Sequence, residues 1–207
     1  MFARLLCRWF CRLFFRMRFI GLENVPSTGP YILAVNHQSF LDPFLAGIAL
    51  KRQLCFMARD SLFKRKILEL MLNSVKAIPV RRGQADLASI KAIIAQLKQG
   101  DGVCLFPEAT RTTDGKIAPF KGGFSLLCRR GNAPVVPVLI DGAFECWPRY
   151  RKLFKAGSKI TVTYGQPISV EKITGMEDED FAAMLTNIMR QMQSQTRIAQ
   201  GKQPFNY

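Results

Sequence analysis

The stretch Asn36–Asp42, with the sequence NHQSFLD, directly follows the apolar run Tyr31–Val35, YILAV. A short apolar run bounded by polar residues predicts a buried strand. A polar turn directly after a buried strand is the place where α/β proteins bind their ligands. His37 is the only histidine in the 207 residues, so any imidazole chemistry near neutral pH depends on it.

His37 and Asp42 are five positions apart, which on a regular helix separates them by roughly 140°. They can meet only if the backbone turns between them and a helix begins near Asp42. We favour Asp42 as the N-cap with Pro43 in the first helical position, since a residue before proline avoids helical angles. Alternatively, Ser39 is the N-cap and Asp42 closes a capping box. The pair is either a base with its orienting carboxylate, or a helix cap beside an ordinary loop histidine.

The composition is that of one globular domain, with 48% hydrophobic and 22% charged residues. The formal net charge of +15 indicates a polyanionic neighbour, which could be nucleic acid, an anionic membrane surface or an acidic substrate. Six cysteines are scattered without a C-x-x-C pair, and one histidine completes no zinc pattern. Such cysteines are typical of reduced core residues in a cytoplasmic protein.

Residues 1–20 carry five arginines and no acidic residue, and no run without arginine is longer than three residues. This pattern excludes a signal peptide core and a membrane span. Four of the arginines recur at every fourth position, opposite large aromatic and aliphatic side chains, which predicts a basic amphipathic helix over 1–20. Such a helix lies in an anionic membrane interface, or else docks on the core of its own domain, residues 21–207.

Apolar runs and helical periodicity alternate along the rest of the chain. This order predicts one α/β domain with a mostly parallel central sheet flanked by helices. We expect strands at 31–35, 54–58, 76–80, 103–106, 135–140 and 160–164, and helices at 43–50, 61–72, 86–99, 123–130 and 178–198. The proline in 76–80 indicates an edge strand or the end of a strand, and the polar tail 200–207 is expected to fray.

Polar clusters follow three of these strands, at Asn36–Asp42, Arg81–Arg82 and Glu108–Arg111. Because parallel strands end at the same edge of a sheet, the three loops can converge. Guanidinium groups recognise phosphate through paired hydrogen bonds. The clusters therefore predict a base beside a phosphate site, although each arginine alone could equally belong to a solvated basic face.

Four ordered segments, NHQSFLD at 36–42, IPVRR at 78–82, FPEATR at 106–111 and VPV at 136–138, resemble the four blocks of the glycerolipid acyltransferase family. The bacterial 1-acylglycerol-3-phosphate acyltransferase type is the most similar, over about Tyr31 to Ile140. The resemblance implies His37 as the catalytic base and Asp42 as its partner. It implies that the acceptor phosphate is bound by Arg82, Glu108, Thr110 and Arg111. It also implies that Val136 and Pro137 form the acyl side of the site. Arg81 stands where the family varies, and Ala109 replaces the usual glycine.

We therefore expect direct transfer of an acyl chain from an acyl thioester, on coenzyme A or acyl carrier protein, to the free hydroxyl of a lysophosphatidate. His37 would remove the hydroxyl proton while Arg82 and Arg111 hold the phosphate, with Glu108 orienting an arginine or the hydroxyl. No metal or resident cofactor is required. The expected location is peripheral, on the cytoplasmic face of the membrane, where the enzyme would contact anionic lipid and its lysophospholipid acceptor.

Three alternatives remain open from the sequence. Another lysophospholipid or a lyso-aminolipid would present a hydroxyl to the same base. A covalent acyl-enzyme could form on Cys55, Cys104 or Cys128. A basic module could bind lipid without chemistry, whereas nucleic acid is not expected as a partner, because the chain contains no known reader motif.

Overall fold

The computed structural model describes residues 9–11, 13–64, 66–74, 76–80 and 87–207. Seven strands form one sheet in the order β1-β7-β6-β2-β5-β3-β4. The strands are β1 (Arg16–Ile20), β2 (Tyr31–Val35), β3 (Leu54–Arg59), β4 (Ala77–Val80), β5 (Gly102–Leu105), β6 (Val135–Asp141) and β7 (Lys159–Tyr164). Every neighbouring pair is parallel except β6 and β7. The predicted α/β domain with a mostly parallel sheet is confirmed.

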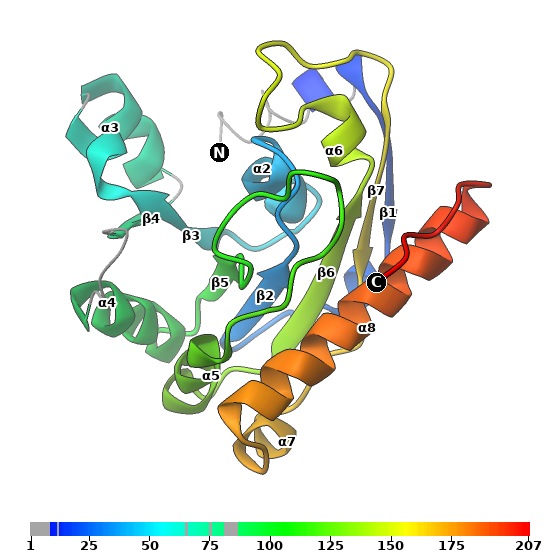
Figure 1. The fold of residues 1–207 in the computed structure, drawn as a ribbon. Coiled ribbons are helices and arrows are strands. Elements are labelled where there is room, and N and C mark those ends of the chain that lie inside the picture. Colours follow the sequence, from blue (N-terminus) through cyan, green and yellow to red (C-terminus); the bar gives the residue numbers. More distant parts are fainter. Residues whose placement is uncertain (1–8, 12, 65, 75, 81–86) are drawn as a thin grey trace.

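Helices cover both faces of this sheet (Figure 1). They are α2 (Asp42–Gly47), α3 (Lys66–Ser74), α4 (Leu87–Lys98), α5 (Ser125–Gly131), α6 (Ala143–Cys146), α7 (Val170–Thr174) and α8 (Asp178–Ala199), with short 3-10 turns at Leu22–Asn24, Asp60–Lys64 and Gly122–Phe124. The single helix expected over 61–72 is therefore wrong, because a 3-10 turn occupies its first residues. None of the described helices is long and apolar enough to cross a membrane.

Each face of the sheet has its own hydrophobic core. Alternate residues of the central strands point to opposite sides, so Ile32 packs with α4, α5 and α8 while Leu33 packs with α2 and α6. Strand β2 lies between β5 and β6 and is buried along its whole length. The proline of β4 lies in a terminal strand of the sheet, as expected, because proline cannot donate a ladder hydrogen bond.

The amino-terminal segment contradicts part of our prediction. Residues 9–11, 13 and 14 are helical, but Arg16–Ile20 forms strand β1, paired in parallel with β7. Met17 and Phe19 pack against the core, whereas the alternate residues of the strand are exposed. The helix expected over 1–20 is therefore wrong for its last five residues, and residues 1–8 and 12 lie outside the described part.

The carboxyl-terminal tail is also ordered differently from our expectation of fraying. The hydroxyl of Tyr207 accepts a hydrogen bond from the backbone N–H of Ile117, at 3.0 Å, and donates one to Gln193. The guanidinium of Arg197 lies over the ring of Phe205, 4.1 Å from its centroid. The tail thereby supports the loop that follows β5, because the hydrogen bonds of Tyr207 and the contact between Phe205 and Arg197 hold it in place.

The direction of the strands places the functional segments together. The carboxyl ends of β2, β3, β4, β5 and β6 share one edge of the sheet, which we call the carboxyl edge. Because β7 is antiparallel to β6 and β1 is parallel to β7, both of these strands begin at this edge. Figure 1 shows the loop after β5 passing beside the start of α2 at the carboxyl edge, with α6 nearby.

Candidate active site

The turn after β2 brings the imidazole of His37 onto the carboxylate of Asp42. His37 Nδ1 lies 2.8 Å from Asp42 Oδ2, and the same oxygen accepts the backbone N–H groups of Gln38, at 2.6 Å, and Ser39, at 2.7 Å. Asp42 is the first residue of α2, with Leu41 as its N-cap, so our preferred assignment of the cap is one residue out. The bond from Ser39 N–H to the carboxylate is the one that the capping-box alternative predicts.

The two members of this pair differ in exposure, which suits a base and its orienting group. The His37 side chain is 18% exposed, whereas that of Asp42 is completely buried. Burial raises the pKa of Asp42, and the hydrogen bonds and charge interaction with His37 and the bonds from Ser39 and Gln38 oppose that rise. Since Nδ1 faces Asp42, Nε2 is the nitrogen that can take a proton from a substrate.

Glu108 holds the backbone of His37 from the neighbouring strand. One carboxylate oxygen accepts the N–H of His37 at 2.7 Å, and the other accepts the N–H of Ala118 at 3.0 Å. The side chain is buried, and desolvation raises the pKa of Glu108 to about 7. These contacts fit a residue that positions His37, while a contact of Glu108 with an arginine or with the acceptor stays a prediction.

The segment after β5 holds His37 at two further points. The N–H of Thr112 donates to the carbonyl of His37 at 2.8 Å. The ring of Phe106 stacks on the imidazole, with 4.2 Å between the centroids and 25° between the planes. His37 is thus held by its N–H, its carbonyl and both its ring face and Nδ1, which restricts the imidazole to one orientation.

Three more polar side chains of the turn form hydrogen bonds with the backbone of other segments. Asn36 exchanges two hydrogen bonds with the backbone of Ile140, which ties the end of β2 to β6. The amide of Gln38 donates to the carbonyl of Gly115 at 3.0 Å, and the hydroxyl of Ser39 donates to that of Trp147 at 2.8 Å. The turn is therefore built as one rigid unit with the loops after β5 and α6.

Comparison with known proteins identifies the family that carries this arrangement. Residues 16–141, more than half of the chain, match the family model described as Acyltransferase. The chain belongs to the acyltransferase family. The match includes both His37 and Asp42, and also Glu108 and Arg111.

Individual relatives agree with this assignment of an acyltransferase. The 1-acyl-sn-glycerol-3-phosphate acyltransferase of Bacillus subtilis is 30% identical over 170 residues, which are 82% of each chain. A chloroplastic enzyme of the same description from Brassica napus is 28% identical over 80% of this chain, which spans about half, 49%, of that longer protein. The crystal structure of the 1-acyl-sn-glycerophosphate acyltransferase PlsC from Thermotoga maritima matches with a TM-score of 0.75 and 25% identity, over 89% of this chain and 74% of that one.

In this acyltransferase, Arg111 lies beside the histidine turn. Its guanidinium stacks on the ring of Phe40, 3.6 Å from the centroid, and Phe40 belongs to the turn that carries His37. This contact holds the guanidinium beside the histidine turn, and a guanidinium group can present paired donors to a phosphate. Thr110 is exposed on the same loop.

The other predicted binding residues stand apart from this cluster or outside the described chain. Arg81 and Arg82 lie outside the described residues, although β4 ends at Val80 on the carboxyl edge. Val136 and Pro137 are buried in the middle of β6, opposite Leu33 and Ala34 of β2, not at its end beside His37. An acyl-binding role for these two residues stays a prediction.

Ala109 occupies the position where the family resemblance expects glycine. Its φ is +61°, in the left-handed region that disfavours a side chain with a Cβ atom. The N–H of Ala109 donates to the carbonyl of Phe106 at 2.9 Å, which closes the turn that aims Glu108 at His37. The chain therefore keeps the glycine-type turn and tolerates the strain of alanine in it.

The cysteines have the environment of core residues. Cys55, Cys104 and Cys128 are buried, and desolvation raises the thiol pKa of Cys55 to about 11 and of Cys128 to about 12, and that of Cys104 even higher. A thiolate is the nucleophilic form of cysteine, and burial disfavours it here. These positions do not favour a covalent acyl-enzyme.

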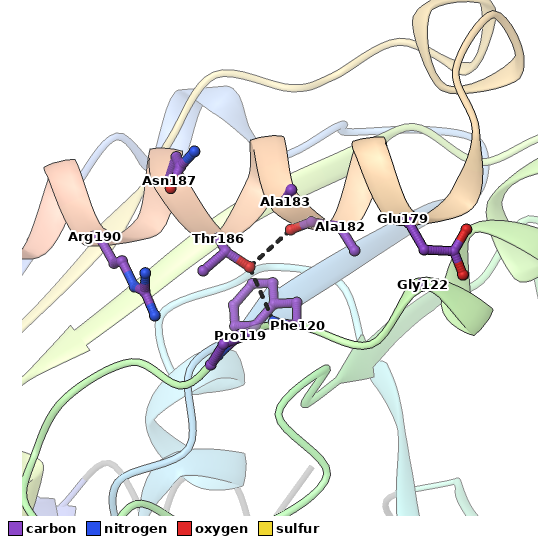
Figure 2. Close-up of a pocket in the computed structure, with 9 residues that line it drawn as sticks. All are labelled: Pro119, Phe120, Gly122, Glu179, Ala182, Ala183, Thr186, Asn187 and Arg190. Carbon is purple, nitrogen blue, oxygen red and sulfur yellow. Dashed lines mark hydrogen bonds between the residues drawn. The ribbon is translucent and has the colours of Figure 1, made fainter. Parts of the chain in front are cut away.

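A hollow of about 270 Å³ lies between α8 and the segment 119–122 (Figure 2). Figure 2 shows Thr186 beneath it, accepting the N–H of Phe120 and donating to the carbonyl of Ala182. No predicted site residue is among those that line it, so we do not assign a substrate to the hollow.

Sequence reasoning missed the residues that support the pair. Gln38 and Ser39 lay inside the recognised motif, but their partners are 77 and 108 positions away. Phe106 and Phe40 are apolar residues to which the sequence pattern assigns no role. The contact of Phe106 with the imidazole depends on the pairing of β2 with β5, which no local pattern around Phe106 shows.

Proposed function

We propose that this acyltransferase moves an acyl chain from an acyl thioester to the free hydroxyl of a lysophosphatidate, giving phosphatidate for phospholipid synthesis. The observation that carries the proposal is the 2.8 Å contact between His37 Nδ1 and a fully buried Asp42 at the carboxyl edge. The names of the relatives support lysophosphatidate as the acceptor.

His37 acts as the general base. Its Nε2 removes the proton of the acceptor hydroxyl as that oxygen attacks the thioester carbonyl carbon. The carbon–sulfur bond then breaks, and the imidazolium returns the proton to the departing thiolate. Asp42 stabilises the imidazolium and holds the tautomer, while Glu108 and Phe106 fix the position of the ring. The chemistry uses no metal or resident cofactor, and coenzyme A or acyl carrier protein enters only as the carrier of the donor.

Two arginines bind the acceptor. Arg111, held by Phe40, and Arg82 bind the phosphate of the lysophosphatidate, and Thr110 and Arg81 contribute to the same site. Val136 and Pro137 contribute to the acyl side of the site, the role that the family resemblance implies. The family assignment and the assembled pair favour this enzyme over a basic module that binds lipid without chemistry.

The protein works as a peripheral enzyme on an anionic membrane, at the cytoplasmic face. Cys11 and Phe15 of the amino-terminal segment are buried in the core, whereas Trp9 and Leu13 are 75% and 73% exposed. One side of the helix thus docks on the domain while the other side faces outward. A test of membrane binding by this helix must therefore replace Trp9 and Leu13. Deleting residues 1–20 would also remove strand β1 from the sheet.

The test is a panel of lysolipid acceptors with the wild type and His37→Ala. The wild type should prefer lysophosphatidate over lysophospholipids with larger headgroups and over lyso-aminolipids. Removal of a general base typically lowers the rate roughly 10²–10⁴-fold, and the variant should remain folded because the imidazole is partly exposed. Near-normal turnover by a folded His37→Ala protein ends the mechanism, and preference for another headgroup reassigns the acceptor.

A further inference from the structure

A basic loop between α6 and β7, residues 147–158, lies at the carboxyl edge next to the amino-terminal helix (Figure 1). From Pro148 to Ile160 the chain carries five cationic residues and no acidic one: Arg149, Arg151, Lys152, Lys155 and Lys159. All five are exposed. This is a concentrated positive surface at the edge of the sheet that carries His37.

Internal hydrogen bonds give the 147–158 loop a defined shape. The indole N–H of Trp147 donates to the carbonyl of Arg151 at 3.0 Å, and the N–H of Lys155 donates to that of Cys146 at 2.9 Å. The N–H of Gly157 donates to the carbonyl of Phe14 at 2.7 Å, which joins the loop to the amino-terminal helix. The two segments therefore present one continuous surface.

Large apolar side chains project from this surface among the cations. Tyr150 is 69% exposed and Leu153 is 77% exposed, and Trp9 and Leu13 of the amino-terminal helix are exposed as well. Phe154 anchors the loop, with its ring centroid 5.4 to 5.5 Å from those of three phenylalanines, Phe10, Phe14 and Phe15. Exposed aromatic and aliphatic residues interspersed with lysine and arginine are typical of proteins that lie in a membrane interface.

The loop is also connected directly to the catalytic turn. The carbonyl of Trp147 accepts the hydroxyl of Ser39, and the ring of Trp147 lies 5.5 Å from that of Phe40, on which Arg111 stacks. A bilayer in contact with the loop would therefore face the edge of the sheet where a lipid acceptor has to reach His37.

We propose that the 147–158 loop is a membrane-docking element, which binds an anionic bilayer together with the exposed side of the amino-terminal helix and turns the carboxyl edge toward the lipid. Charge complementarity selects anionic lipid, since each cation near such a surface contributes about fivefold to partitioning. An acidic carrier protein would use the same cations, but it does not account for Tyr150 and Leu153. The inference goes beyond the role proposed for residues 1–20 and does not depend on catalysis.

The test compares two variants that lose the same charge. Arg149→Ser/Lys152→Ser/Lys155→Ser removes three cations from the loop. Lys98→Ser/Arg130→Ser/Lys172→Ser removes three exposed cations near the opposite edge of the sheet, where α4, α5 and α7 lie. Binding is measured by flotation with vesicles of phosphatidylcholine containing one third phosphatidylglycerol, and with pure phosphatidylcholine.

The loop variant should bind anionic vesicles about 100-fold more weakly than the wild type, while the control loses much less. Leu153→Asn should weaken binding to both vesicles, by about tenfold. Equal losses in the two charge variants would overturn the proposal, because binding would then follow net charge alone. Unchanged flotation of the loop variant with a raised KM for acyl carrier protein thioesters would also overturn it, and would assign the loop to the carrier protein. Flotation requires no turnover, so these outcomes are independent of the proposed reaction.

Discussion

Replacing Glu108 by glutamine tests whether this residue positions His37 or binds the acceptor. Both carboxylate oxygens accept backbone N–H groups, from His37 at 2.7 Å and from Ala118 at 3.0 Å. A glutamine side chain has one acceptor oxygen, so one of the two N–H groups would face an NH₂ group. A buried donor without an acceptor costs about 1–3 kcal/mol. The variant should relieve that cost by moving the turn that carries His37.

For Glu108→Gln we expect kcat to fall about 10- to 100-fold, with little change in the KM of either substrate. The reason is that the cost of about 1–3 kcal/mol for the unpaired N–H is relieved by displacing His37, the general base. The exposed Glu23→Gln is the control and should behave as the wild type. Since His37 is the only histidine, its imidazole resonances are unambiguous by NMR, and they should shift or broaden in Glu108→Gln alone.

Glu108→Gln should also change how the stability of the folded protein depends on pH. The folded pKa of Glu108 is raised from 4.5 to about 7, so this carboxyl group favours folding at low pH and that contribution is lost as pH rises from 4.5 through 7. The change corresponds to roughly 3 kcal/mol. Glutamine does not titrate. Urea unfolding should therefore show the wild type losing stability relative to the variant as the pH is raised from 4.5 to 8.

Two outcomes would refute this reasoning. An unchanged kcat with an acceptor KM raised about tenfold would show that a Glu108 oxygen contacts the substrate, as the family resemblance implied. A stability difference that is the same at pH 4.5 and pH 8 would show that the carboxyl group does not titrate in a desolvated site.

Further substitutions address the remaining parts of the site. Asp42→Asn should lower kcat by roughly 10²-fold or more with the fold retained, because the amide favours the wrong imidazole tautomer; circular dichroism controls for folding. Arg111→Lys keeps the charge but loses the planar fork stacked on Phe40, so the acceptor KM should rise while the donor KM stays constant, and a change in the donor KM alone would move Arg111 to the carrier side. Ala109→Gly should raise the Tm by about 2–4 °C by relieving a φ of +61°, whereas Ala156→Gly, which lacks a positive φ, should not.

The pair His37 and Asp42 could be predicted from the sequence because both residues lie in one short segment. His37 and Asp42 are five residues apart, and the strand, turn and helix that bring them together are all encoded between Tyr31 and Gly47. The role of Glu108 could not be predicted in this way. Its partner is a backbone N–H 71 positions earlier, and a backbone donor leaves no trace in the pattern of side chains.

The error at Arg16–Ile20 has a different cause. The arginines recur at every fourth position through Arg16, and this spacing predicts a helix that continues to residue 20. The last five residues also alternate, with Arg16 and Arg18 outside and Met17 and Phe19 toward the core, which is the period of a strand. The helical and the strand period overlap in this segment. The strand forms because it pairs with the edge of β7, whose backbone hydrogen bonds would be left unmade if the segment were helical.

This strand matters for function because it determines where the amino-terminal helix lies. Six neighbouring strand pairs hold the sheet together, and only β6 and β7 run in opposite directions. That single reversal makes β7 begin at the carboxyl edge, and β1, parallel to β7, must begin there too. The helix before β1 and the basic loop before β7 are consequently brought to the edge that holds His37. A parallel β7 would have left both on the opposite edge, so the docking surface and the catalytic pair share one face because of the sheet topology.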